Sequence, residues 1–137
     1  MVELRVSEVY SGQPGCIATA RRAVTAFLAR IGTDTAVRIP ADTVGQAQLV
    51  VSELVTNAVQ HTGGECGLQL ELVADEVEIT VWDTDASPAE VTVAQPDPLR
   101  VGQHGLEIVK ALCGRLRVSP APRGKQVQVR MALPLAV

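Results

Sequence analysis

Apolar residues recur along the chain with two spacings, one typical of helices and one typical of strands. Repeats of three and four residues predict helices at 14–32, 42–62 and 105–114. Alternation of apolar and polar residues predicts strands at 2–10, 66–73, 76–83, 115–124 (ending in a turn) and 125–135. This order predicts an α/β two-layer sandwich, in which three helices cover one face of a mixed, largely antiparallel sheet.

The predicted strands each carry one apolar and one polar face. The inward residues of the two middle strands are Leu68, Leu70, Leu72, Val77, Ile79 and Val81. Helices are therefore needed on one side of the sheet only. In the last helix the inward residues are expected to be Leu106, Val109 and Leu112. The 137 residues are long enough for one such domain, expected to span 1–137.

Residues with special backbone preferences mark the expected helix ends. Pro14 suits the first turn of the first helix, and Gly32 is a credible stop for it. Asp42 or Thr43 is expected to cap the second helix, and Gly114 to end the third. These signals place the helix ends close to where the apolar repeats stop.

Periodicity disappears between Thr84 and His104. This stretch contains three prolines and few apolar residues. A loop of about twenty residues is unusual inside a small domain, and such loops often act as lids or binding segments. We expect a lid at residues 84–104.

Composition narrows the classes of function. The net charge of -3 argues against a dedicated nucleic-acid binder, which needs a basic face. Cys16, Cys66 and Cys113 are far apart and form no CxxC pair, which argues against zinc and favours reduced thiols. The N-terminus has no signal-peptide pattern and no segment is long and apolar enough to span a membrane, so we expect a cytoplasmic protein.

The second predicted helix carries Glu53, Asn57 and His61 at intervals of four residues, so they lie along one side of it. A carboxylate such as Glu53 can accept a proton from a hydroxyl group or water. An amide oxygen such as that of Asn57 suits Mg²⁺, which takes few protein ligands. By spacing alone, however, a solvated helix surface explains these residues better than a site does.

Three further places combine suitable chemistry with weak patterns. Asp83 ends a strand beside the long loop, where it can accept a hydrogen bond from an exocyclic amine or simply bind its own backbone. Gly102 and Gly105 flank a helix start that favours anions, and His104 between them either contacts phosphate or is a surface residue. Gln126 follows a glycine and a lysine that fit an ordinary turn and an edge strand.

The order of these blocks resembles the GHKL (Bergerat-fold) ATP-binding superfamily. "ELVTNAVQH" resembles its N box and "VWDTD" its first glycine box. "GQHGLEIVKAL" resembles the second glycine box and "GKQVQV" the third. Within the superfamily, the short chain and its "ARRAV" helix are similar to stand-alone anti-sigma-factor serine kinases, also called switch-protein kinases.

The resemblance implies a role for each motif residue. Glu53 matches the general base that activates a substrate serine, Asn57 the Mg²⁺ ligand, and His61 the end of the N box near the phosphates. Asp83 matches the adenine-reading carboxylate. Residues 84–104 match the ATP lid, and Gly105 with Leu106 its returning edge against the triphosphate.

The resemblance also implies cofactors and partners. The cofactors are ATP and Mg²⁺. A protein of this type binds a sigma factor as a homodimer and phosphorylates an antagonist (anti-anti-sigma) protein, without direct contact to nucleic acid or membrane.

The glycine boxes depart from the family pattern. No glycine lies between Thr84 and Ser87, where the first box has two, and Gln103 replaces the first glycine of the second box, with Gly102 one position early. Gln126 stands where the third box usually has threonine. These losses predict weaker or altered nucleotide binding on an unchanged fold.

Two functions therefore compete. The first is an anti-sigma serine kinase using Mg·ATP. The second is a non-catalytic regulator that binds its partner through the helical face, with ATP structural or absent. A histidine kinase catalytic domain fits less well, because no phosphoacceptor-histidine hairpin is present, and a gyrase-type ATPase would need a transducer domain.

Overall fold

The computed structural model describes residues 4–62, 64–84, 103–122 and 124–134. The strands are β1 (Arg5–Tyr10), β2 (Cys66–Val73), β3 (Glu76–Asp83), β4 (Leu116–Ala121) and β5 (Gly124–Ala132). The helices are α1 (Cys16–Thr35), α2 (Ala41–Thr62) and α3 (Gln103–Cys113). The predicted element order is therefore confirmed.

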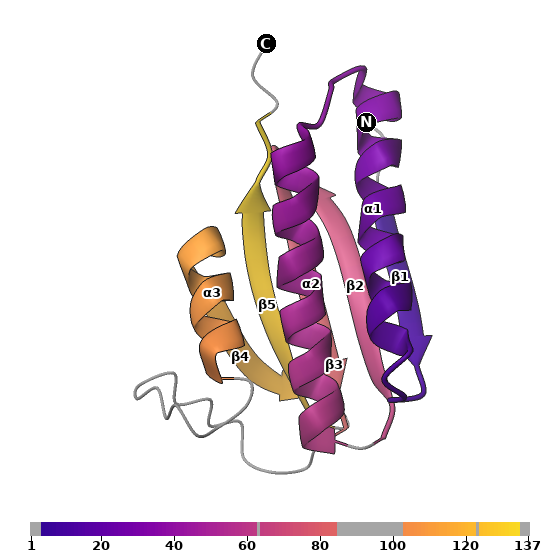
Figure 1. The fold of residues 1–137 in the computed structure, drawn as a ribbon, viewed down its shortest axis with the longest axis vertical. Coiled ribbons are helices and arrows are strands. Elements are labelled where there is room, and N and C mark those ends of the chain that lie inside the picture. The colour runs from indigo at the N-terminus through magenta and orange to yellow at the C-terminus, as the bar shows by residue number, and fades with distance from the viewer. Residues whose placement is uncertain (1–3, 63, 85–102, 123, 135–137) are drawn as a thin grey trace.

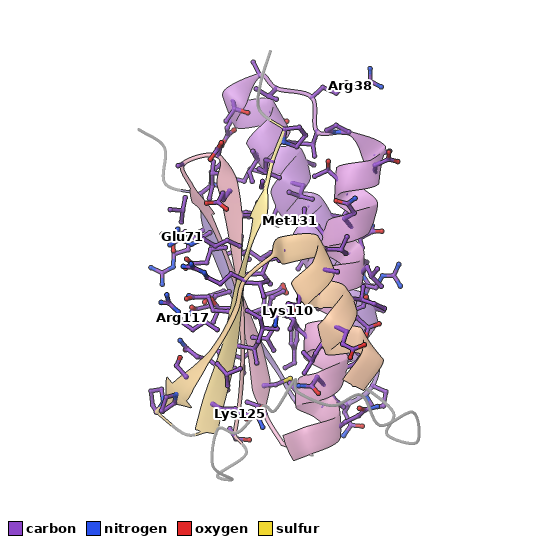
Figure 2. The ribbon with its side chains drawn as sticks, turned by 90° about the vertical axis from the view of Figure 1, so that its left-hand side faces the viewer. Arg38, Glu71, Lys110, Arg117, Lys125 and Met131 are labelled. Atoms are coloured by element: carbon purple, nitrogen blue, oxygen red, sulfur yellow. The ribbon has the colours of Figure 1, made fainter. Side chains whose placement is uncertain are left out.

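The strands form one five-stranded sheet in the order β1-β2-β3-β5-β4. All pairings between the described strands are antiparallel, so no parallel pair makes the sheet mixed. The helices cover one face of this sheet, as the side view in Figure 2 shows. The two-layer α/β sandwich is thus confirmed, and we call the uncovered side the open face.

Aliphatic side chains fill the space between the two layers. Phe27 and Leu28 from α1, Leu54 and Val55 from α2, and Leu70 from β2 are buried. Since the chain has one Phe, one Trp and one Tyr, branched aliphatic residues must supply most of the packing. None of the described helices combines the length and apolar character needed to cross a bilayer.

The first helix continues beyond the predicted stop. Helix α1 ends at Thr35, and Ala36 after it adopts a left-handed conformation with φ 56°. The N–H of Val37 donates to the carbonyl oxygen of Gly32 at 3.1 Å. A Cβ atom on Gly32 would lie 3.0 Å from the Val37 carbonyl oxygen. The glycine therefore allows the close return of the chain, rather than ending the helix at its own position.

Two other local predictions need correction. Helix α2 begins at Ala41, so Asp42 lies inside its first turn, where a carboxylate favours the helix dipole, instead of at the cap. Leu106 and Val109 of α3 are buried as predicted, but Leu112 is 36% exposed. Helix α3 packs against α2, β4 and β5, and Figure 1 shows it on the outer side of α2, away from α1. Gly114 (φ 76°) follows the helix as predicted.

Candidate functional site

The predicted site residues belong to elements that meet at one end of the molecule. Helix α2 packs against β2, β3 and α3. At the lower end of Figure 1, the C-terminal end of α2, the end of β3, the start of β5 and the first turn of α3 come together. Because neighbouring strands are antiparallel, these segments, although distant in the sequence, lie at the same end of the sheet. The site residues can therefore act together.

Asn57 lies on the buried side of α2. It is 6% exposed, and Leu54 three residues before it and Ala58 after it belong to the core. Glu53, one turn earlier, is half-buried. Four residues of helix correspond to a rise of about 6 Å, so the carboxylate and the amide lie one above the other. His61 lies in the last turn of α2, but its side chain is outside the described residues.

Asp83 forms a buried ion pair. Its Oδ2 lies 3.8 Å from Nζ of Lys125, and the two side chains are only 5% and 7% exposed. Both residues are on the helix-facing side of the sheet, at the end of β3 and the start of β5. A carboxylate with acceptor lone pairs and an ammonium with donor hydrogens thus lie side by side on the helix-facing side of the sheet.

The residue of β5 beside Asp83 is Lys125, not the predicted Gln126. Gln126 pairs with Trp82, which lies on the other side of the pleat from Asp83. Its side chain therefore lies on the open face, away from the helices. Strand β5 lies between β3 and β4, so Lys125 is not an edge lysine either. The sequence carried a signal: Lys125 continues the inward alternation of Val127, Val129 and Met131.

A row of polar groups continues across the sheet from Asp83. Cys66 of β2 pairs with Asp83, and Tyr10 of β1 pairs with Cys66. Burial, with smaller effects from Cys16 and Asp83, raises the pKa of the Cys66 thiol to about 11. Burial and the hydrogen bond that the Tyr10 hydroxyl donates to Glu8 at 2.6 Å raise the pKa of that phenol. Both groups are neutral near pH 7, so the carboxylate of Asp83 and the ammonium of Lys125 provide the charge of this row.

The segment after Asp83 is described only at its ends. The Thr84 hydroxyl donates to the carbonyl oxygen of Glu65 at 3.1 Å. Residues 85–102, which make up most of the predicted lid and include Gly102, lie outside the described residues. His104 and Gly105 lie in the first turn of α3, although their side-chain surroundings are not described, and Leu106 is buried there. The N–H groups of this turn point toward the same end of the molecule as Asp83.

The open face carries a separate polar network. Glu78 accepts from Arg130 Nε at 2.9 Å and from Gln128 Nε2 at 3.0 Å. The Trp82 indole lies over Gly67, where a Cβ atom would meet it at 2.1 Å. Figure 2 shows Glu71 and Arg117 pointing away from the helices on this side. These contacts satisfy surface groups and leave the face polar.

Two cavities in the described part of the chain lie away from these residues. One, of about 350 Å³, is lined by Glu76, Cys113, Arg115, Arg117, Gln128, Val129 and Arg130. Another lies along α1 and reaches Gln48 of α2. None of the predicted site residues lines either cavity.

Comparison with known families agrees with this geometry. The family model of the histidine kinase-like ATPase domain matches residues 10–131. The chain belongs to this family. The match confirms the resemblance to the GHKL superfamily. A histidine kinase-like ATPase domain implies ATP binding. A comparison with curated proteins finds no match.

Solved structures share the fold of this ATPase domain. A structure of the RsbU and RsbW domains of Rv1364c from Mycobacterium tuberculosis matches 94% of the chain with a TM-score of 0.66 and 20% identity. The match covers 32% of the chain in that structure, so the present chain spans about a third of its length. The histidine kinase domain of a blue-light activated histidine kinase from Erythrobacter litoralis matches 80% of the chain and 61% of its own length, with a TM-score of 0.55 and 21% identity.

Proposed function

We propose that this ATPase domain is a protein-serine kinase that uses Mg·ATP and regulates a sigma factor. The observation that carries the proposal is the placement of Glu53 and buried Asn57 one turn apart on α2, at the end where Asp83 lies. Family membership supplies the nucleotide class. The fold shared with a structure containing an RsbW domain supports the anti-sigma type that the motifs resemble.

The residues present fit this chemistry. The amide oxygen of Asn57 is a hard neutral ligand that would hold Mg²⁺, which takes its other ligands from phosphates and water. Glu53 is half-buried, so part of the residue is exposed to solvent. It would accept the proton of the attacking serine hydroxyl. Bound Mg·ATP supplies the phosphoryl group, and the side chains supply positioning and charge stabilisation.

The remaining motif residues would hold the nucleotide. Asp83 would accept a hydrogen bond from the exocyclic amine of adenine. His61, Gly102 and His104 would lie near the phosphates, and Gly105 with Leu106 would form the returning edge of the lid. The N–H groups in the first turn of α3 favour such an anion, because helix N-termini carry partial positive charge.

The proposed partners are a sigma factor and an antagonist protein that accepts the phosphoryl group. We propose that the domain acts in the cytoplasm as a homodimer, binds the sigma factor, and loses its antagonist once that protein is phosphorylated. The net charge of -3 agrees with a protein partner better than with direct binding to nucleic acid.

Phosphorylation in vitro tests this function. The protein is incubated with Mg·ATP and candidate antagonist proteins from the same genome, and phosphoserine is detected by mass spectrometry. Glu53→Ala should lower the rate by roughly 10²- to 10⁴-fold, because a positioned general base contributes that much. Glu71→Ala on the open face is the matched control and should leave the rate unchanged.

Two outcomes separate the proposal from its alternative. If no antagonist is phosphorylated while Mg·ATP binds and Asn57→Ala loses that binding, the domain is a non-catalytic ATP-binding regulator. If phosphorylation proceeds equally in Glu53→Ala, the proposed role of Glu53 is wrong.

A further inference from the structure

The ion pair between Asp83 and Lys125 is unusual for its position. Lys125 is 6% exposed and is the only buried lysine or arginine among the described residues. The next inward residues of its strand are Val127, Val129 and Met131, which form ordinary core. Taking two charges out of water costs free energy that their attraction often fails to offset. Stability therefore gives a poor reason for a lysine here.

The geometry suggests a chemical reason instead. Nζ of Lys125 and Oδ2 of Asp83 are 3.8 Å apart, on neighbouring strands and on the same face. A donor and an acceptor at this separation can each form a hydrogen bond to adjacent polar atoms of one planar ring. Adenine presents such a pair: the exocyclic N6–H donates, and ring atom N1 beside it accepts. Guanine presents the reverse order, with O6 accepting and N1–H donating.

We propose that Lys125 reads the nucleotide base together with Asp83, donating from Nζ to N1 of adenine while Asp83 accepts from N6–H. This inference rests on the proposed nucleotide site. It gives a base-reading role to Lys125 rather than to Gln126, the β5 residue of the predicted site, whose side chain lies on the open face. A site that pairs a buried donor and a buried acceptor rejects a base with the opposite order, because both groups would lose their partners.

Calorimetry on the full chain tests the pairing. The probes are Mg·ATP, Mg·GTP and Mg·1-deaza-ATP, in which a C–H group replaces N1. On the unaltered protein, 1-deaza-ATP should bind roughly ten- to a hundredfold more weakly than ATP, since a hydrogen bond to a charged group is lost. GTP should also bind more weakly than ATP. This comparison changes the nucleotide and not the protein, so an effect of a substitution on folding cannot explain the result.

A variant completes the test. Lys125→Met should weaken binding of ATP by the same roughly ten- to hundredfold and should leave the affinity for 1-deaza-ATP unchanged. Lys110→Met is the matched control, because Lys110 is the chain's other lysine and is exposed on α3. It should not change either affinity.

Three results would overturn the inference. Equal affinities for ATP and 1-deaza-ATP on the unaltered protein would show that N1 is not read. Equal losses for both nucleotides in Lys125→Met would assign the lysine a general electrostatic role. Absence of all nucleotide binding would overturn the proposed function as well, whereas the first two results leave it intact.

Discussion

Strands β3 and β5 are joined by two ion pairs that differ in nearly every respect. On the open face, Arg130 Nε and Glu78 Oε2 lie 2.9 Å apart, with side chains 53% and 16% exposed. On the helix-facing side, Lys125 and Asp83 lie 3.8 Å apart and are 7% and 5% exposed. The shorter pair is partly exposed to solvent, and Gln128 also donates a hydrogen bond to Glu78. The longer pair is buried.

The difference in burial between the two pairs distinguishes an ordinary surface ion pair from one that is a candidate for a functional role. An exposed pair between two side chains contributes about 0–1 kcal/mol, so the Glu78 pair can vary at little cost. Burying an ion pair costs desolvation free energy, and removing one partner of a buried pair destabilises the protein strongly. Asp83 and Lys125 lie at the end of the sheet where α2 ends and α3 begins, whereas Glu78 and Arg130 lie further along the sheet.

The largest expected effect is on nucleotide binding. Asp83→Asn replaces an acceptor oxygen with an amide donor where the base amine is expected. We predict a loss of roughly a hundredfold in affinity for Mg·ATP, measured by calorimetry. Glu78→Gln, the same change on the open face, should alter affinity less than about twofold. Equal effects of the two substitutions would remove the functional distinction between the pairs.

The second effect is on stability. Lys125→Met leaves the Asp83 carboxylate buried without its cation, and we expect the free energy of unfolding to fall by about 3 kcal/mol. Arg130→Met on the open face should cost less than about 1 kcal/mol. Urea denaturation followed by circular dichroism measures both. A cost for Arg130→Met as large as that for Lys125→Met would contradict the assignment of the buried pair.

Packing on the open face should matter more than its charges. Gly67→Ala places a Cβ atom 2.1 Å from the Trp82 indole, so the ring must move. We expect a loss of about 1–3 kcal/mol in the free energy of unfolding. Gly45→Ala is the control: its Cβ meets no atom within 4 Å, and the substitution removes a glycine from helix α2. The Gly45→Ala substitution should stabilise the protein by up to about 1 kcal/mol. A Gly67→Ala protein as stable as the parent would show that Trp82 does not pack over residue 67.

The smallest effect concerns pH. Burial raises the pKa of the Cys66 thiol to about 11, so the folded protein keeps a proton that the unfolded chain loses near pH 9. The contribution of Cys66 to stability is fully present below pH 9 and should fall as the pH rises toward 11, with a slope of up to about 1.4 kcal/mol per pH unit from this group.

Cys66→Ala isolates this contribution. It should reduce the slope between pH 9 and 11, even though the lost packing lowers the whole curve. Denaturant titrations at several pH values give the slopes, and an unchanged slope in the variant would mean that another group titrates.

Much of the fold could be predicted from local patterns. Alternation in β2, β3 and β5 and the helical repeats of α1 and α2 gave the elements, because apolar spacing reflects which face is buried. Local signals failed where tertiary contacts decide. Leu112 continues the helical stripe of α3 but is 36% exposed, and Gly32 marks a chain return five residues later instead of a helix stop.

The candidate site was predicted less completely. Asn57 could be recognised at the edge of an apolar stripe, and its burial agrees with a site role. Lys125 was missed as a partner of Asp83 because the pairing depends on sheet order, which the sequence does not specify. The side-chain alternation of β5 was the better guide to position.

Chemical shift mapping with Mg·ATP tests whether the nucleotide binds where α2, β3, β5 and α3 meet. Backbone and methyl resonances are recorded as the nucleotide is added to the labelled full chain. The account predicts the largest shifts at Asn57, Asp83, Leu106 and Lys125, with little change at Arg130. Shifts concentrated around Arg115, Arg117 and Arg130, or no shifts at saturating nucleotide, would contradict it.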